Sequence, residues 1–280
     1  MKTKQLIAVL VVVAVVGLLY SFDIKGLVKP KGDRAVNSNP VSASSVTFNT
    51  QIASASAKAS LNANLASQIT SIEDEIKNAS GQKKFKLQQQ LLQKWDDVNQ
   101  PAPAAFIAEE IALSQNSFKN WLLAGDKFTQ AFTNYSDTSA IPALVSKAIF
   151  AYNKALAIDG DNFDAKTGLG VAYVTEGIHP MQGIQLLLGV VKQQPSNLKA
   201  NMNLGLFSMK SGQFEKAVTR FKTVLAVQPS PEAYFYLATS YENLGAKNEA
   251  LLAYTKSKEL AADPGLTKYV DQKIRELNNK

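Results

Sequence analysis

The sequence predicts an all-α protein in which stacked helix pairs form an α-solenoid, preceded by a transmembrane helix and a helical N-terminal region. Three observations carry this prediction. Apolar residues recur at alternating three- and four-residue spacing, a set of small and large residues repeats every 33 to 35 positions in the C-terminal half, and the chain opens on a long apolar run. The helices are therefore expected to share a continuous core rather than to fold singly.

Composition excludes several classes of protein. The 280 residues include no Cys and one His, which rules out a disulfide framework, a thiolate zinc site, a cysteine nucleophile and a multi-histidine metal site. The net charge is +7, and residues 1–45 hold six Lys or Arg against two acids. Basic residues beside a membrane meet anionic head groups, so this excess does not call for a nucleic-acid partner, and none is expected.

The apolar run from Leu6 to Phe22 carries no charge, and as a helix it would be about 26 Å long, enough for a bilayer core of roughly 30 Å. A cleaved signal peptide looks similar, but bulky Leu18, Leu19 and Tyr20 stand where small residues precede a cut. We therefore interpret residues 1–22 as a cytoplasmic tip and an uncleaved signal-anchor.

Topology is less constrained, because Lys2 and Lys4 precede the apolar run while four basic residues follow it. A short basic N-terminus usually stays in the cytoplasm. The sequence thus favours a single-pass inner-membrane protein of a bacterial envelope with its bulk on the periplasmic or extracytoplasmic side; a cytosolic-facing scaffold is the reversed alternative.

Residues 23–45 are rich in Gly, Pro, Asn and Ser and are expected to form a flexible linker. Residues 46–117 are expected to be helical, with a third helix at 104–114 that turns Glu109 and Glu110 outward. Two apolar stripes support this: Leu65, Ile69, Ile72 and Ile76, then Phe85, Leu87, Leu91, Leu92 and Trp95. They fit a hairpin packed on the chain or a short coiled coil that dimerises through residues 55–98.

The repeat signal begins in the C-terminal half. Leu204-Gly205, Gly212, Ala217 and Phe221 recur 33 residues later, and similar residues lie 34 or 35 positions earlier. Two helices approach closely only where small side chains meet large ones, which explains Gly205 and Ala217 beside Phe221. Each unit is therefore a helix pair, and several must stack to bury their apolar faces.

These residues resemble the tetratricopeptide repeat (TPR) family, whose pattern is Trp-x2-Leu-Gly-x2-Tyr, then Ala-x3-Phe, Ala and Pro. Three repeats match within 163–264, and a degenerate copy occupies 118–162, with Trp121 and Tyr152 at family positions and about ten extra residues from Thr133 to Pro142. Residues 265–280 look like the C-terminal capping helix of such arrays.

The resemblance implies a right-handed superhelix whose first helices line a groove for a protein or peptide. The groove residues that this alignment predicts are Lys199, Met202, Asn203, Leu206, Lys210, Phe235, Tyr236, Thr239 and Asn243. Further positions from the same alignment are Lys119, Leu122, Asp126, Asp164, Thr167, Val171 and Glu232. The Lys and Asn clamp by which some members hold a peptide carboxylate is missing, because Thr167, Val171, Met202 and Leu206 stand there. Met202 and Phe235 also fit simple packing between helices.

No catalytic residue, cofactor or metal site is expected. Gly168-Leu169-Gly170 lacks the third glycine and the preceding strand of a dinucleotide loop, and Asp159 opens a calcium-like segment whose bidentate Glu is missing. His179 lies in an inter-helix turn beside no nucleophile. The chain is not expected to be an enzyme.

The predicted function is a membrane-tethered scaffold or adaptor that binds protein or peptide partners in envelope protein assembly, export or chaperoning. One alternative is a structural oligomer, a possible homodimer, self-associating through residues 55–98. The family resemblance also leaves open a coordinator of cell division or cell-wall synthesis and an assembly factor for cytochrome c.

Overall fold

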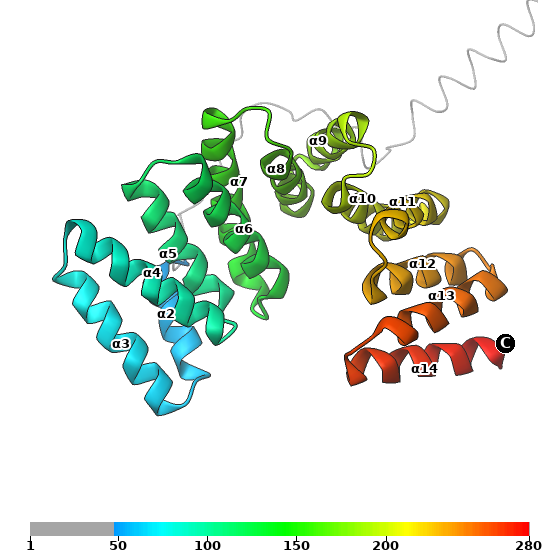
Figure 1. Ribbon diagram of the computed structural model, residues 1–280, viewed down its shortest axis with the longest axis horizontal. Coiled ribbons are helices and arrows are strands. Elements are labelled where there is room, and N and C mark those ends of the chain that lie inside the picture. The colour runs from blue at the N-terminus through cyan, green and yellow to red at the C-terminus, as the bar shows by residue number, and fades with distance from the viewer. Residues whose placement is uncertain (1–47, 280) are drawn as a thin grey trace, which may run out of the picture. The chain divides into compact units, whose positions relative to one another are not determined.

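The computed structural model describes residues 48–279; the predicted membrane anchor and the predicted linker lie outside them. Within this range every regular element is helical (Figure 1). The elements are α2 (Thr50–Ala59), α3 (Ala63–Lys77), α4 (Gly81–Asp97), α5 (Pro101–Ser114), α6 (Phe118–Asn134), η1 (Thr138–Ala140), α7 (Ile141–Ile158), α8 (Phe163–Glu176), α9 (Pro180–Gln193), α10 (Leu198–Lys210), α11 (Phe214–Val227), α12 (Pro231–Asn243), α13 (Lys247–Leu260) and α14 (Pro264–Asn278).

Consecutive helices pack as pairs. The pairs are α6/α7, α8/α9, α10/α11 and α12/α13, and α14 packs on α13. The first helices α6, α8, α10 and α12 also contact one another in sequence, so they form one continuous face, which we call the first-helix face. The helix-pair solenoid predicted from the repeats is confirmed for the described part of the chain.

The repeat residues do what the spacing predicts. A Cβ on Gly205 would lie 2.6 Å from Cε1 of Phe221, so only glycine lets α10 approach α11 this closely. Phe221 and Ala217 are fully buried. Gly212 ends the turn between the two helices with φ +72°, a left-handed conformation that favours glycine, and Gly245 repeats it at +74°.

The degenerate pair differs from the others in its connection. Between α6 and α7 the extra residues form the short helix η1, whose Asp137 caps the amide of Ser139 at 2.9 Å. Together η1 and α7 are the single stretch of the described residues long and apolar enough to cross a membrane. Leu144, Val145 and Ala148 are nevertheless buried in the core that α7 shares with α5, α6 and α8.

The N-terminal stripes pack inside the chain. Ile69 and Ile72 of α3 are buried in one cluster with Leu91 and Trp95 of α4, and α5 completes it. The hairpin alternative therefore describes these residues, and the dimer through 55–98 stays a prediction that would have to use other side chains. Helix α2, which packs on α5, was not anticipated as a separate element because Ile52 is the one large apolar side chain among its ten residues.

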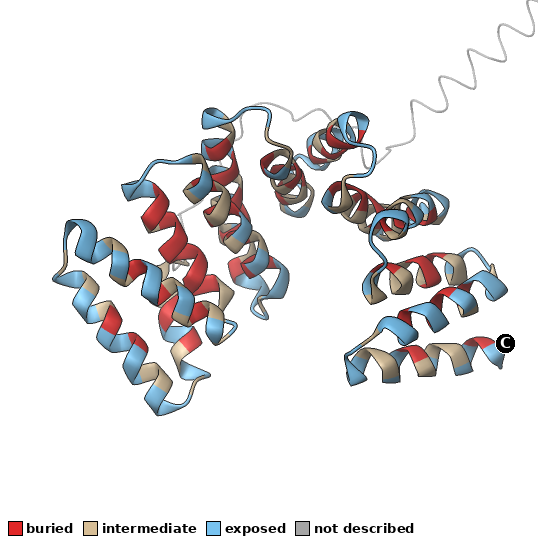
Figure 2. Ribbon diagram, viewed as in Figure 1, coloured by how far each residue is buried: buried red, intermediate tan, exposed pale blue. Residues whose placement is uncertain are grey.

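Helix α5 corrects one expectation. It starts at Pro101 rather than after the prolines, since proline is favoured in the first helical turn. Buried residues run along nearly all of it (Figure 2). Glu109, expected to point outward, is 6% exposed, and its carboxylate lies 2.9 Å from the Lys147 ammonium of α7. Helices α2, α4 and α6 all pack on α5, which leaves it little solvent-facing surface.

Candidate functional site

The helices of the first-helix face begin at N-cap residues that can be recognised in the sequence. Asn162, Asn197 and Ser230 accept hydrogen bonds from the first-turn amides of α8, α10 and α12, so all three helices start at equivalent points. The second residues of α8 and α10 are Asp164 and Lys199, whose charged atoms lie 2.8 Å apart. This hydrogen bond raises the pKa of Lys199. The ion pair ties two successive repeats together at one edge of the face.

Apolar side chains occupy the middle of the face. Met202 and Leu206, both predicted, are half-buried on α10, and Met209 continues their stripe. Phe235 and Tyr236 of α12 are half-buried beside them. The face therefore exposes a continuous strip of apolar atoms while the same side chains pack on the core, so the packing and groove interpretations both describe them.

An aromatic cluster ends this strip. The Tyr236 ring stacks on Phe221 with centroids 5.7 Å apart, and the Phe235 ring lies 5.8 Å from Tyr254. Tyr269 of α14 lies 5.7 Å from Phe235 and is 48% exposed. Helix α14, predicted only as a cap, thus adds an aromatic side chain to the surface that a partner would meet.

At the N-terminal end of the face, a tyrosine reaches through from a second helix. Tyr152 of α7 passes between Gly125 and Gly168, where any Cβ would overlap its ring. Its hydroxyl donates to Oδ1 of Asp126 at 2.9 Å and lies 2.9 Å from the Thr129 hydroxyl. Burial raises the pKa of Tyr152 well above its usual range, so the phenol stays protonated and remains a donor.

The C-terminal repeat uses the same device. Tyr254 of α13 donates to Oε2 of Glu242 at 2.8 Å and lies 3.2 Å from the Thr239 hydroxyl. Burial raises its pKa as well. The other oxygen of Glu242 lies 3.6 Å from Nζ of Lys273 on α14. Hydrogen-bonded polar groups thus lie at both ends of the first-helix face, with the apolar strip between them.

Six further predicted residues occupy four different settings. The amides of Asn203 and Asn243 donate to carbonyls of their own helices at 2.8 Å, and Lys119 and Glu232 are exposed. Thr167 is only 3% exposed, and its hydroxyl lacks a hydrogen-bond partner within residues 48–279, so it does not present a group to the groove. Lys210 is exposed at the end of α10, where it lines a different hollow.

Sequence reasoning missed part of this surface. Met209, Glu242 and Tyr269 belong to it but were not named. A signal was available: the aromatic position of the second helix is Tyr in the first and last pairs, and a buried phenol normally has a hydrogen-bond partner. Searching the preceding helix for that partner would have found Asp126 and Glu242.

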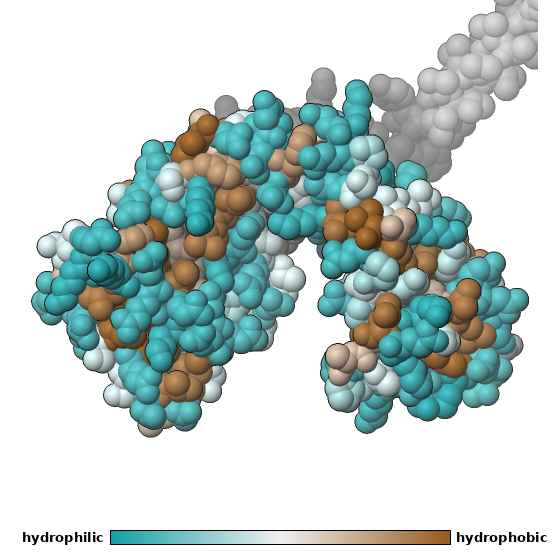
Figure 3. All heavy atoms as spheres, in the orientation of Figure 1, coloured by the Kyte–Doolittle hydropathy of each residue, from teal (hydrophilic) through white to brown (hydrophobic). Residues whose placement is uncertain are grey.

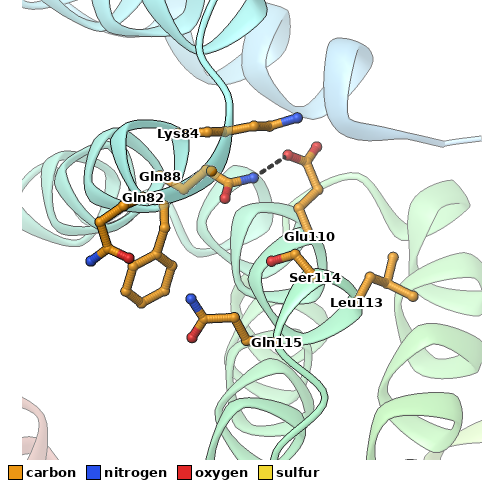
Figure 4. Close-up of a pocket in the computed structure, with 9 residues that line it drawn as sticks. Gln82, Lys84, Gln88, Glu110, Leu113, Ser114 and Gln115 are labelled. Atoms are coloured by element: carbon orange, nitrogen blue, oxygen red, sulfur yellow. Dashed lines mark hydrogen bonds between the residues drawn. The ribbon is translucent and has the colours of Figure 1, made fainter.

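A polar hollow of ≈ 630 Å³ lies between α4 and α5. Gln88 and Glu110 point toward each other across it (Figure 4), and the Gln88 amide donates to the carboxylate at 3.1 Å. Leu113 stands at its rim. Across residues 48–279, His, Cys, Asp and Glu form no group of three that could hold a metal ion.

Comparisons with known proteins agree with the geometry. The tetratricopeptide repeat family model matches residues 208–266, from the end of α10 to the start of α14. The BBSome complex member BBS4 of Bos taurus is 33% identical over 88 residues, which are 31% of this chain and 17% of that relative.

A solved structure has a similar fold. A thermophilic TPR protein of Thermus thermophilus superposes with a TM-score of 0.55 at 18% identity, covering 67% of this chain and 97% of that one. A crystal structure of MamA protein gives 0.45 at 19% identity, over 62% and 90%. The family match identifies a tetratricopeptide repeat within residues 208–266, and the helix-pair geometry shows that the same fold extends over the neighbouring pairs of the described residues.

Proposed function

We propose that this protein is a membrane-tethered scaffold that binds a segment of a partner protein along the first-helix face. The observation that carries the proposal is the strip formed by Met202, Leu206, Met209, Phe235 and Tyr236, which stays half-exposed between two polar ends. Large apolar and aromatic side chains of this kind are enriched where proteins bind one another. The BBS4 relative is itself named as a member of a complex.

The chemistry of the face selects the partner segment. Apolar or aromatic side chains of the partner would cover the strip, while the Asp164–Lys199 pair and Glu242 would face polar groups beside it. A chain-terminal carboxylate has no cationic clamp to meet on α8 or α10. An internal segment with spaced apolar residues is therefore the proposed ligand, and a tether would raise its effective concentration.

Site-specific photo-crosslinking tests this binding without disturbing the core. A photoreactive amino acid replaces exposed Tyr269 or half-exposed Met202 in the full-length protein, in cells that make it naturally. We expect both positions to capture the same protein. The matched control is Leu252, 65% exposed on α13, which should not capture it. Equal capture at all three positions would contradict binding at the first-helix face.

The tether is proposed from the uncharged run Leu6–Phe22, with the repeats on the extracytoplasmic side and a role in envelope assembly, export or chaperoning. Charged residues at the centre of a membrane helix cost about 2.5–3.5 kcal/mol each on insertion scales. Val12→Arg with Val15→Arg should therefore release the protein from alkaline-washed membranes. Protease digestion of intact cells and of cells with only the outer membrane permeabilised then shows on which side of the inner membrane the repeats lie. Protection of the repeats after outer-membrane permeabilisation would contradict this topology.

A further inference from the structure

A second surface lies away from the apolar strip, in a cleft between α9 and the α10/α11 pair with a volume of ≈ 760 Å³. We call it the α9 cleft. Its apolar lining residues are Val174, Pro180, Met181, Ile184, Leu188, Leu204 and Phe207. Figure 3 shows apolar atoms at the surface near α10, bordered by hydrophilic ones. The volume suits several side chains of a docked segment.

Helix α9 carries an apolar stripe that its counterparts lack. Met181, Ile184 and Leu188 are spaced i, i+3 and i+7, so they lie on one helical face, and Met181 is 67% and Leu188 42% exposed. The repeat register places Val218 and Leu251 at the position of Ile184. The positions of Met181 and Leu188 are polar and exposed in every other pair: Ser146 and Asn153, Glu215 and Lys222, and Asn248 and Thr255.

The apolar residues at the two outer positions of α9 are not needed for folding. Helix pairs α6/α7, α10/α11 and α12/α13 pack with only the central position apolar, so the two outer apolar residues of α9 are not required by the repeat. Met181 and Leu188 therefore leave apolar atoms exposed at the cleft, and Ile178 in the turn before α9 is exposed as well. Exposed apolar patches are typical of sites where another molecule binds.

The rim of the α9 cleft is cationic. Lys210, Lys216 and Arg220 line it, and no Asp or Glu is among its lining residues. None of these three forms an ion pair within the part of the chain that the structure describes. Arg220 donates to the neutral amide of Asn201 at 3.1 Å, and Lys216 to that of Gln213 at 2.6 Å. Their positive charges are therefore available to a partner.

We propose that the α9 cleft binds an amphipathic helix of a partner protein whose apolar stripe is flanked by carboxylates. Its apolar residues would pack against Met181, Ile184 and Leu188, and its Asp or Glu side chains would reach Lys210, Lys216 and Arg220. Helix-in-groove recognition reads apolar anchors at i, i+3 or i+4 and i+7, the spacing that α9 itself presents. The site is distinct from the first-helix face and does not depend on the function proposed for it.

The test measures the affinity of purified full-length protein in detergent for labelled helical peptides of about 18 residues. One peptide has Leu at i, i+3, i+4 and i+7 with flanking Glu. A second replaces every Glu by Lys, and a third replaces every Leu by Ser. We expect the acidic peptide to bind at least about tenfold more tightly than either control, with an affinity that falls as salt rises.

The neighbouring repeat supplies the variant. Met181→Glu with Leu188→Lys gives α9 the residues that α11 carries at these positions, Glu215 and Lys222, so folding should be retained. We expect binding to weaken at least about tenfold, and Lys216→Glu to weaken it about threefold to tenfold and to flatten the salt dependence. Leu252→Lys, an exposed leucine on α13, is the matched control and should bind as wild type.

Other occupants give different results. Sedimentation that shows a dimer lost in the Met181→Glu, Leu188→Lys variant would place a second copy in the cleft and overturn the proposal. Equal affinity for the acidic and basic peptides, or binding of anionic vesicles but not of the acidic peptide, would do the same. Tyr269→Asp on α14, at an exposed position outside the cleft, should leave peptide binding unchanged, which separates this test from failure of the first-helix face.

Discussion

The two terminal helix pairs and the two middle pairs of the array solve one packing problem with different chemistry. The second helix of each pair places one large side chain against the first helix: Tyr152 and Tyr254 at the ends, Leu187 and Phe221 in the middle. All four are buried, yet only the tyrosines carry a hydroxyl through to the first-helix face. The same position in the repeat thus holds either an apolar side chain that only fills space or a tyrosine that also hydrogen-bonds to the first helix.

The first helices show why tyrosine can replace an apolar residue at this position. Two of their positions hold the hydrogen-bond partners of the tyrosine hydroxyls in the terminal pairs, and the repeat register places apolar residues at the same positions in the middle pairs. The polar sets are Asp126 with Thr129 and Thr239 with Glu242, and the apolar sets are Val171 with Val174 and Leu206 with Met209. Burying a hydroxyl without a partner costs about 1–3 kcal/mol, so we expect the three positions to change together.

Removing the apolar filler should have the largest effect. Phe221→Ala is expected to cost about 3–5 kcal/mol of unfolding free energy, because it empties a fully buried site. In a repeat array each unit contacts only its neighbours, so the loss should be local. Hydrogen exchange should rise in α10–α12 and stay unchanged in α3 and α4. Uniform loss of protection along the chain would contradict this, and Leu252→Ala is the exposed control.

Crowding the tyrosine should come next. Gly168→Ala puts a methyl group into the Tyr152 ring, and overpacking of this kind costs about 1–3 kcal/mol. Gly189→Ala on α9, whose Cβ would meet nothing within 4 Å, should leave stability unchanged or raise it by up to about 1 kcal/mol. Thermal unfolding followed by circular dichroism compares the two. Similar melting temperatures would mean that Tyr152 moves aside freely.

Exchanging the hydroxyls tests the comparison directly. Tyr152→Phe should cost about 0.5–1.5 kcal/mol, the net value of an ordinary hydrogen bond. Phe221→Tyr should cost about 1–3 kcal/mol, because its hydroxyl would face Leu206 and Met209 without a partner. Adding Met209→Glu, which copies the position of Glu242, should recover part of that loss. Urea unfolding of all four proteins measures this, and no recovery would refute the proposed coupling of positions.

The smallest expected effect is a pH dependence at the N-terminal end. Desolvation raises the pKa of Asp126 above its ordinary 3.8, although the bond from Tyr152 opposes this. The folded state then binds the proton more tightly than the unfolded state, so this group's contribution is greatest at low pH and is lost as pH rises through the raised folded value. Asp126→Asn should flatten stability against pH in that window, measured by urea midpoints. An unchanged profile would assign the dependence to other carboxylates.

Much of the fold could be predicted because its signals are local and recur. The spacing of Gly205, Ala217 and Phe221 indicated a helix pair, and each repetition strengthened the same conclusion. Helix α2 and the true extent of α5 could not be read this way. Helix α2 has a single large apolar residue, Ile52, and so shows no apolar stripe in its sequence. A helix covered on nearly every side, as α5 is, loses the alternation that marks an outward face.

The candidate site was predictable in outline only. Repeat register placed Met202, Leu206, Phe235 and Tyr236 on one face, and the structure brings them together. The repeat register could not show that Thr167 is buried, that Lys210 lines the α9 cleft, or that Tyr269 of α14 contributes to the first-helix face. Those outcomes depend on how neighbouring helices cover one another.

By itself, the sequence determined the helix pairs, their glycine turns and the identity of the repeat, because each depends on residues a few turns apart. Only the tertiary structure decided which tyrosines meet a carboxylate, why Glu109 is buried beside Lys147, and that the outer stripe of α9 borders a cationic cleft. Burial and electrostatic environment are properties of several helices at once, so no single stretch of sequence encodes them.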